Sequence, residues 1–167
     1  GFVKDPKVGM SEWVVSFDLN SLYPHLIMQY NISPEKFVKK VPMWHNTDEL
    51  ISKKPIDYEP GYIYSGNGCV YKNDYQGFLP ALMEKMYNDR SEYKKKMIEL
   101  KKKFEETKDA ATGMQIAKYH NMQMAKKIQL NSAYGALGNK YFRWFNFDLA
   151  ESITKSGQLS IRWIEKR

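Results

Sequence analysis

Cysteine is nearly absent from the sequence, since Cys69 is the only one. A single thiol excludes an intrachain disulfide and a metal site made of several thiolates, and it fits a reducing compartment such as the cytoplasm. Long apolar runs are also missing, because none approaches the roughly 18 residues of a membrane-spanning helix. No basic stretch with an apolar signal core opens the chain. We therefore expect a cytoplasmic protein with no membrane partner.

Acidic residues are outnumbered: 26 Lys and Arg stand against 19 Asp and Glu, which gives a formal net charge of +7. This excess favours an anionic partner, with nucleic acid first and an acidic lipid surface second, although it could also serve solubility alone. With 167 residues, 43% of them hydrophobic, the chain can bury the core of one domain. It starts at Gly1 rather than methionine and ends in the helical pattern SIRWIEKR, so we expect a piece of a larger protein.

The first half of the sequence predicts a mixture of short elements. Residues 13–18 are aromatic and β-branched, which predicts a short buried strand. A helix is expected from an N-cap at Ser21 to about residue 30. Residues 35–60 are predicted to be irregular with one short helix, whereas GYIYSGNGCVY, residues 61–71, predicts a β-hairpin that turns at Ser-Gly-Asn-Gly.

The second half is predicted to be helical. Apolar side chains recur with helical spacing over residues 80–108, which predicts a long helix. A second long helix is predicted over residues 114–136, with the break at Gly113. The two helices are expected to form an antiparallel hairpin with arms on the order of 30 Å long. Asp148 and Glu151 resemble a capping box at the start of a last helix. The expected fold is therefore α+β and mostly helical.

Asp18 ends the predicted strand just before the first helix. The first backbone N–H groups of a helix lack intrahelical partners, so the stretch from about Asn20 to Tyr23 is an anion site suited to phosphate. A carboxylate beside such a site repels the ligand unless a divalent cation lies between them. Mg²⁺ is the natural choice, because it takes oxygen ligands from carboxylates and substrate phosphates. The alternative is that Asp18 only caps the helix or a turn, and this stretch does not decide between the two.

Three more side chains share one face of the second long helix, since Lys127, Asn131 and Tyr134 are spaced at i, i+4 and i+7. A cation, an amide and an aromatic ring suit a ligand with phosphates and a flat base, although a solvated helix face is the alternative. Arg90 and Lys94, four residues apart on the first long helix, can converge with Lys127 on one triphosphate. Here the alternative is ordinary surface charge.

Two of these stretches resemble motifs of a known family. DLNSLYP, residues 18–24, resembles the first palm motif of family B DNA polymerases, and KKIQLNSAYG, residues 126–135, resembles their fingers motif. The flanking GFVKDP and ALGN are similar to tailed-phage replicative polymerases. The resemblance covers most of the chain and is weakest in residues 35–75.

The resemblance divides the chain into three parts. Residues 1–79 would form a partial palm with the first catalytic motif, residues 80–136 the fingers hairpin, and residues 137–167 a return to the palm. The fold would be a partial palm sheet that carries a two-helix antiparallel fingers hairpin.

The first motif would supply the metal and sugar contacts. Asp18 would be the first of two essential metal-binding aspartates and therefore catalytic, with the backbone carbonyl of Leu19 as a further ligand. The backbone amides of Ser21 and Leu22 would hold the incoming triphosphate. Tyr23 would lie under the sugar and exclude a 2′-hydroxyl, which selects deoxynucleotides.

The long helices would supply the remaining contacts. Asn131 would support the phosphate contact, and Tyr134 with Gly135 would pack on the nascent base pair. Three cations would bind the phosphates, with Lys127 also acting in catalysis, namely Arg90, Lys94 and Lys127.

The implied activity is DNA-directed DNA polymerisation with two Mg²⁺ ions, primer-template DNA and a dNTP. In the family a second palm carboxylate follows the fingers in a Tyr-x-Asp-Thr-Asp-like hairpin, and the chain ends before any such element. We therefore expect the chain to be inactive alone. Its partners would be the remaining polymerase segments, with the second carboxylate and the thumb, in a longer polypeptide or a separate chain. A sliding clamp is a further candidate partner, and a viral protein of this kind would act in the host cytoplasm.

Two other functions remain open from the sequence. The first is a non-catalytic basic helical hairpin that binds nucleic acid through charge alone, for which Asp18 beside the helix start would have no use. The second is a protein-primed polymerase of the same family, although no insertion for a terminal protein is obvious.

Overall fold

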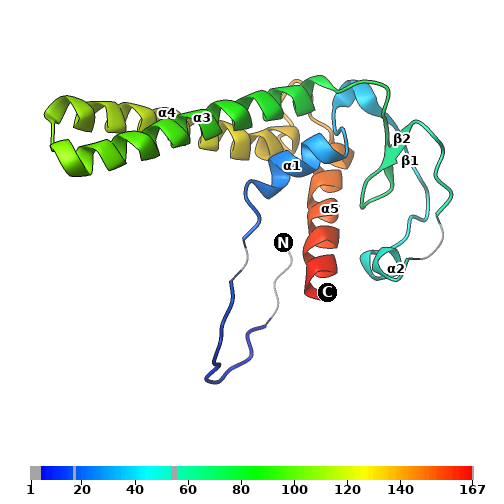
Figure 1. Cartoon of the computed structure of the whole chain (residues 1–167). Coiled ribbons are helices and arrows are strands. Elements are labelled where there is room, and N and C mark those ends of the chain that lie inside the picture. The colour runs from blue at the N-terminus through cyan, green and yellow to red at the C-terminus, as the bar shows by residue number, and fades with distance from the viewer. Residues whose placement is uncertain (1–4, 17, 54–55, 167) are drawn as a thin grey trace.

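The computed structural model describes residues 5–16, 18–53 and 56–166. A long helical hairpin projects from a smaller body of three helices and one sheet (Figure 1). Among the residues described, no helix combines the length and the apolar character needed to cross a bilayer. The elements follow in the order α1 (Leu22–Gln29), a 3-10 turn (Pro34–Lys36), β1 (Phe37–Lys40), α2 (Thr47–Ile51), β2 (Tyr62–Tyr64), β3 (Cys69–Lys72), α3 (Phe78–Thr107), α4 (Ala110–Leu137) and α5 (Phe147–Lys166). The predicted α+β, mostly helical class is confirmed.

The sheet has three antiparallel strands in the order β1-β3-β2. The β2–β3 hairpin turns at the predicted Ser-Gly-Asn-Gly sequence, with Tyr64 opposite Val70. β1 lies in the stretch that was predicted to be irregular and pairs Lys40 with Cys69. The sequence gives no alternating signal there, because three of the four β1 residues are exposed. β1 forms because the backbone N–H and C=O groups on the second edge of β3 are available to pair with it.

The predicted helical hairpin is confirmed, but the break lies at residues 108–109 rather than at Gly113. Lys108 adopts a left-handed backbone with φ 51°, which ends α3. The Asp109 carboxylate then accepts hydrogen bonds from the N–H groups of Ala111 and Thr112, at 3.3 and 3.1 Å. These bonds lower the pKa of Asp109 below its ordinary value. An N-cap with two backbone partners decides the break more strongly than a helical glycine does.

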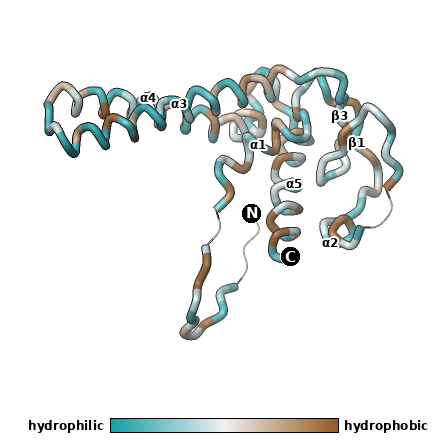
Figure 2. Tube along the Cα trace, in the orientation of Figure 1, coloured by the Kyte–Doolittle hydropathy of each residue, from teal (hydrophilic) through white to brown (hydrophobic). Residues whose placement is uncertain are grey.

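Residues 13–16 do not form the predicted buried strand. Trp13 is 96% exposed and Val15 71% exposed, and Figure 2 shows this brown apolar segment standing away from the body. A strand is stabilised by neighbouring strands, and none of the strands in the described ranges pairs with this segment. The apolar side chains of residues 13–16 therefore stay exposed, because no other part of the described structure packs against them.

The start of α5 also differs from its prediction. The Asn146 side chain caps the helix, because its Oδ1 accepts from the N–H groups of Asp148 and Leu149 at 2.9 and 3.4 Å. Asp148 and Glu151, predicted as a capping box, instead bind Lys40 Nζ at 2.9 and 2.7 Å. This pairing raises the pKa of Lys40 and lowers that of Glu151. The two carboxylates thus tie α5 to β1.

Asn31 fixes the start of α3. Its Nδ2 donates to the carbonyl oxygens of Lys72 at 2.8 Å and Tyr75 at 3.0 Å, and its Oδ1 accepts from the N–H of Gly77 at 2.8 Å. The buried hydroxyl of Ser33 accepts from the N–H of Leu79. These hydrogen bonds fix the start of the helical hairpin. Next to it lies a core shared by α1, β3, α3, α4 and α5, whose buried residues include Leu26, Ile27, Tyr71, Met83, Leu130 and Ile153.

Candidate functional site

A cavity of about 380 Å³ opens where the start of α1 meets α3 and α4. Its lining comes from three stretches that are far apart in the sequence. The first is the segment around the start of α1, the second is the inner half of α3, and the third is the inner half of α4. The lining residues are Asp18, Asn20, Ser21, Leu22, Tyr23, Pro24, Arg90, Lys127 and Asn131.

The cavity holds charges without matching partners. Asp18 is the only carboxylate in its lining, and Arg90 and Lys127 are its two cations. Within the described ranges, Asp18 and Lys127 form no ion pair. Arg90 Nη1 donates to Ser21 Oγ at 3.2 Å, but its Nε is buried without a hydrogen-bond partner. A buried donor without a partner is costly, so the site is suited to a ligand that brings anionic oxygens.

Ser21 lies at the predicted N-cap position, but its side chain does not cap α1. Its backbone is left-handed, with φ 52°, and its hydroxyl accepts from Arg90 instead. The N–H groups of the first turn of α1 therefore receive no side-chain cap from Ser21 at the edge of the cavity. Free N–H groups at the positive end of a helix dipole favour an anion.

An aromatic pair joins α1 to α4 beside the cavity. The rings of Tyr23 and Tyr134 lie 4.9 Å apart at an angle of 52°. Gly135 follows Tyr134 on the exposed side, and no atom lies within 4 Å of where its Cβ would be. The pair offers an apolar surface and an open approach next to the charged cavity.

Four of the predicted site residues are not in the cavity lining, namely Leu19, Lys94, Tyr134 and Gly135. Lys94 is exposed on α3, one helical turn beyond Arg90. Leu19 instead lines a separate groove of about 590 Å³ between α1, α2 and α5, together with Trp163 and Ile164. The predicted metal ligand was the backbone carbonyl of Leu19, and that contact stays a prediction.

One supporting contact was missed from the sequence. Lys126 Nζ lies 2.8 Å from the Asp89 carboxylate, so an ion pair joins α3 and α4 beside the two cavity cations. Each partner directly precedes a cavity residue in the sequence, Asp89 before Arg90 and Lys126 before Lys127. The sequence signal for this ion pair was an acid next to one predicted site residue and a base next to another, on two helices predicted to be antiparallel.

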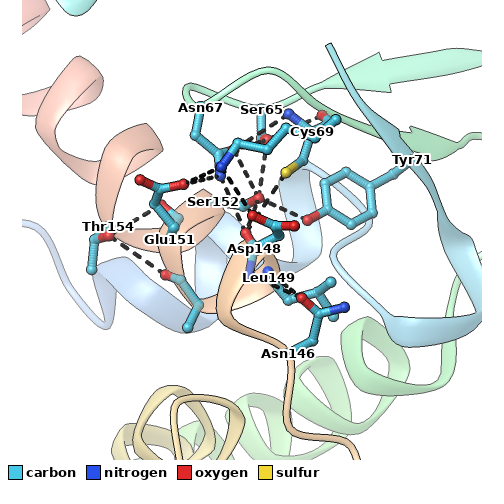
Figure 3. Close-up of polar contacts among 12 residues, drawn as sticks. Ser65, Asn67, Cys69, Tyr71, Asn146, Asp148, Leu149, Glu151, Ser152 and Thr154 are labelled. Carbon is cyan, nitrogen blue, oxygen red and sulfur yellow. Dashed lines mark hydrogen bonds and ion pairs between the residues drawn. The ribbon is translucent and has the colours of Figure 1, made fainter. Parts of the chain in front are cut away.

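A second missed feature is the buried polar network between the β2–β3 turn and α5 (Figure 3). The Ser152 hydroxyl lies 2.8 Å from Tyr71 Oη, 2.9 Å from Asn67 Oδ1 and 2.8 Å from the Asp148 carbonyl oxygen. Burial raises the pKa of Tyr71, so this phenol stays protonated and can donate. The network is fully paired and binds the turn to the helix, which makes it structural.

A family model described as DNA polymerase family B matches residues 1–166. The chain belongs to DNA polymerase family B. The DNA-directed DNA polymerase of Escherichia phage RB69 is 30% identical over 209 residues, which cover 99% of this chain and 23% of the phage protein. A DNA polymerase of Pyrococcus glycovorans is 31% identical over 166 residues, which cover 99% of this chain and 18% of the archaeal protein.

A solved structure supports the fold of this family B chain. The family B DNA polymerase of Pyrobaculum calidifontis superposes with a TM-score of 0.61 at 22% identity, over 88% of this chain and 17% of the archaeal one. The match to the family model over residues 1–166 confirms, at the level of the family, the resemblance stated from the sequence motifs. The chain spans less than a quarter of the length of these curated relatives.

Proposed function

We propose that this family B chain carries the incoming-nucleotide site of a DNA-directed DNA polymerase. The observation that supports the proposal is the single cavity that Asp18, Arg90 and Lys127 line together. These residues come from three separate elements, and a triphosphate is the ligand that would satisfy both cations and the free N–H groups of α1.

In this proposal each lining residue has a defined contact. The N–H groups of Ser21 and Leu22 bind phosphate oxygens, and the side chains of Arg90 and Lys127 neutralise them. Asn131, four residues after Lys127 on α4, supports the phosphate contact. Lys94 reaches the outermost phosphate from its position one turn along α3, when the helices close over the nucleotide.

The sugar and base would lie against the aromatic pair. Tyr23 packs on Tyr134 and is itself part of the cavity lining. Its ring is therefore held in place beside the phosphate site, where it can exclude a 2′-hydroxyl. Gly135 leaves open space next to the ring of Tyr134, which a base pair could fill.

The donor set of the cavity fits Mg²⁺ in part. Asp18 supplies one carboxylate, and the proposed second oxygen, the Leu19 carbonyl, belongs to a residue outside the cavity lining. The described residues hold no group of three His, Cys, Asp or Glu side chains that could bind a metal. Mg²⁺ held by one carboxylate completes its shell with phosphates and water. When bound, two such ions would activate the primer hydroxyl and stabilise the leaving group.

The remaining segments of a polymerase would cover the apolar surfaces that this chain leaves open. The groove beside α5 and residues 13–16 expose large apolar side chains, including Trp13 and Trp163. On this proposal, residues 1–79 and 137–167 belong to the palm and residues 80–136 to the fingers, and primer-template DNA binds the complete assembly.

The purified chain alone is expected to show no templated incorporation of a dNTP. One carboxylate in the cavity cannot hold two Mg²⁺ ions about 3.5–4 Å apart. A primer-extension assay with a labelled primer measures this directly, with the phage RB69 polymerase as a positive control. Templated extension by this chain alone would contradict the proposed division of the active site.

Replacing Tyr23 by alanine is expected to remove any preference of the chain for dATP over ATP. The ring that excludes the 2′-hydroxyl is lost, whereas the phosphate contacts remain. Competition against a fluorescent dATP analogue measures the ratio of the two affinities. Tyr23→Phe is the matched control, because it keeps the ring and should keep the preference.

The same titration separates this function from charge-only binding of nucleic acid. A basic helical hairpin without a nucleotide site would bind DNA with a strong salt dependence, and dATP at equal ionic strength would not compete. An unchanged ratio in Tyr23→Ala, from a chain that does prefer dATP, would show that another group selects the sugar.

A further inference from the structure

His25 lies four residues after Ser21 on α1, and its side chain has no part in the nucleotide contacts proposed above. Its Nδ1 lies 3.0 Å from the carbonyl oxygen of Ser21, and its backbone N–H donates to the same oxygen at 3.2 Å. A carbonyl oxygen only accepts hydrogen bonds, so the proton of the neutral ring must be on Nδ1. Two donors of one residue therefore meet on the two lone pairs of a single acceptor.

The backbone of Ser21 needs this support, because it is left-handed with φ 52°. A residue with a Cβ adopts this conformation at a cost, and the conformation persists only where surrounding contacts hold it. The imidazole of His25 binds the Ser21 carbonyl oxygen, and Arg90 Nη1 donates to the Ser21 hydroxyl at 3.2 Å. Ser21 is thus held at its main chain by one residue and at its side chain by the other.

The carbonyl of Ser21 and the N–H of Leu22 belong to one peptide unit. In a planar trans peptide these two groups point in opposite directions, so the direction of one sets the direction of the other. Because the carbonyl oxygen is turned toward the His25 ring, the Leu22 N–H points away from that ring. Leu22 lines the cavity, and α1 has no side-chain cap that would occupy this N–H.

The imidazole ring also packs on α3. Its centre lies 4.7 Å from the centre of the Tyr87 ring, in an edge-to-face arrangement at 82°. Tyr87 lies three residues before Arg90, so the two side chains share one face of the helix. His25 therefore contacts both the start of α1 and the helix that supplies the arginine of the cavity.

We propose that His25 is a positioning residue of the nucleotide site, which directs the Leu22 N–H at the phosphates by holding the Ser21 carbonyl. His25 is not among the residues that line the cavity, so it acts through this peptide unit rather than by touching the nucleotide. The hydrogen bond from Nδ1 has this role, whereas the ring contact with Tyr87 supports the fold. The inference rests on the proposed function, which makes phosphate the ligand of the Leu22 N–H.

Two variants of the whole chain separate the donor from the ring. His25→Phe keeps a ring beside Tyr87 and removes the donor, whereas His25→Asn keeps an N–H on a nitrogen bonded to Cγ and removes the ring. We expect His25→Phe to weaken the binding of a fluorescent dATP analogue about fivefold and His25→Asn to stay within about twofold of the unaltered chain. His45→Phe is the matched control, because it makes the same chemical change just before α2, outside the cavity lining.

Thermal unfolding distinguishes positioning from a merely structural role. His25→Asn should have the lower unfolding midpoint, since it loses the packing on Tyr87, and His25→Phe should unfold close to the unaltered chain. The two variants are therefore expected to rank in opposite orders for dATP affinity and for stability. If dATP affinity instead follows the unfolding midpoint, with His25→Asn the weaker binder, the proposal is overturned.

Two further measurements locate the effect. Inorganic triphosphate should lose the same factor as dATP in His25→Phe, because the affected amide meets phosphate. Unchanged triphosphate binding in this variant would place the effect at the sugar or the base and overturn the proposal. In the ¹⁵N NMR spectrum of the neutral His25 ring, we expect the proton on Nδ1, and a proton on Nε2 would mean that the contact with Ser21 does not form.

Failure of this inference and failure of the proposed function give different results. If the unaltered chain binds dATP and His25→Phe binds it equally well, the nucleotide site stands and His25 does not position it. If the unaltered chain binds neither dATP nor triphosphate, the nucleotide site is wrong, and the role of His25 in it is overturned as well.

Discussion

Lys127→Ala is expected to weaken the binding of dATP by at least about tenfold. A hydrogen bond to a charged group contributes about 1.5–3 kcal/mol, and about 1.4 kcal/mol corresponds to a factor of ten. Arg90→Ala should lose at least as much, because Arg90 also anchors Ser21 at the start of α1. Titration of a fluorescent dATP analogue in low salt measures both.

Lys101→Ala is the matched control for these variants, because Lys101 is an exposed lysine farther along α3 and lies outside the cavity lining. It changes the net charge by the same amount as Lys127→Ala and should leave dATP affinity nearly unchanged. Equal losses in both lysine variants would mean that dATP binds through overall charge, and the cavity would have no special role.

Gly66→Ala is expected to destabilise the fold by about 3 kcal/mol. A Cβ at this position would lie 2.8 Å from the backbone carbon of Lys155 and from the nitrogen of Ser156, on rigid helical backbone. The turn must therefore move away from α5, which costs overpacking and the bond from the Gly66 N–H to Ser156 Oγ. Thermal unfolding followed by circular dichroism should show a midpoint lower by about 10 °C.

Gly135→Ala is the matched control for this substitution. No atom lies within 4 Å of its Cβ position, and Gly135 lies inside α4, where alanine is favoured over glycine by about 1 kcal/mol. Its midpoint should stay the same or rise. A Gly66→Ala chain as stable as the unaltered one would show that the turn does not press on α5 in solution.

The sequence predicted the elements whose signals are local. The 3.6-residue apolar period over α3 and the Ser-Gly-Asn-Gly turn each depend on residues that are close together in the sequence, and both elements are present. β1 was missed because its pairing depends on β3, about thirty residues later. Residues 13–16 were predicted wrongly for the opposite reason, since β-prone side chains form a strand only beside a partner. The cap at Asn146 was overlooked in favour of acids whose partner, Lys40, is distant in sequence.

That several candidate site residues lie together was predictable from spacing on single helices and from the family motifs. Asp18, Arg90 and Lys127 meet at one cavity because a hairpin brings distant stretches of α3 and α4 to the start of α1. The ion pair of Asp89 with Lys126 left only a weak signal, an acid and a base next to two predicted site residues. The network at Ser152 could not be predicted, because it needs the relative placement of the β2–β3 turn and α5. The roles of the individual residues remain to be tested by the variants above.

The hydrogen bonds of Asn31 fix the start of α3, so a tilt of this helix would displace residues farther along it by a larger distance. Asn31 holds the carbonyl oxygens of Lys72 and Tyr75 and the N–H of Gly77, which fixes the start of the helix to the segment after β3. Arg90 lies twelve residues after Phe78, about 18 Å from that start along the axis. A tilt of about 10° would displace Arg90 by about 3 Å, roughly the length of one hydrogen bond. On the proposed function, a small rotation at the start of α3 would be enough to bind or release the phosphates of the nucleotide.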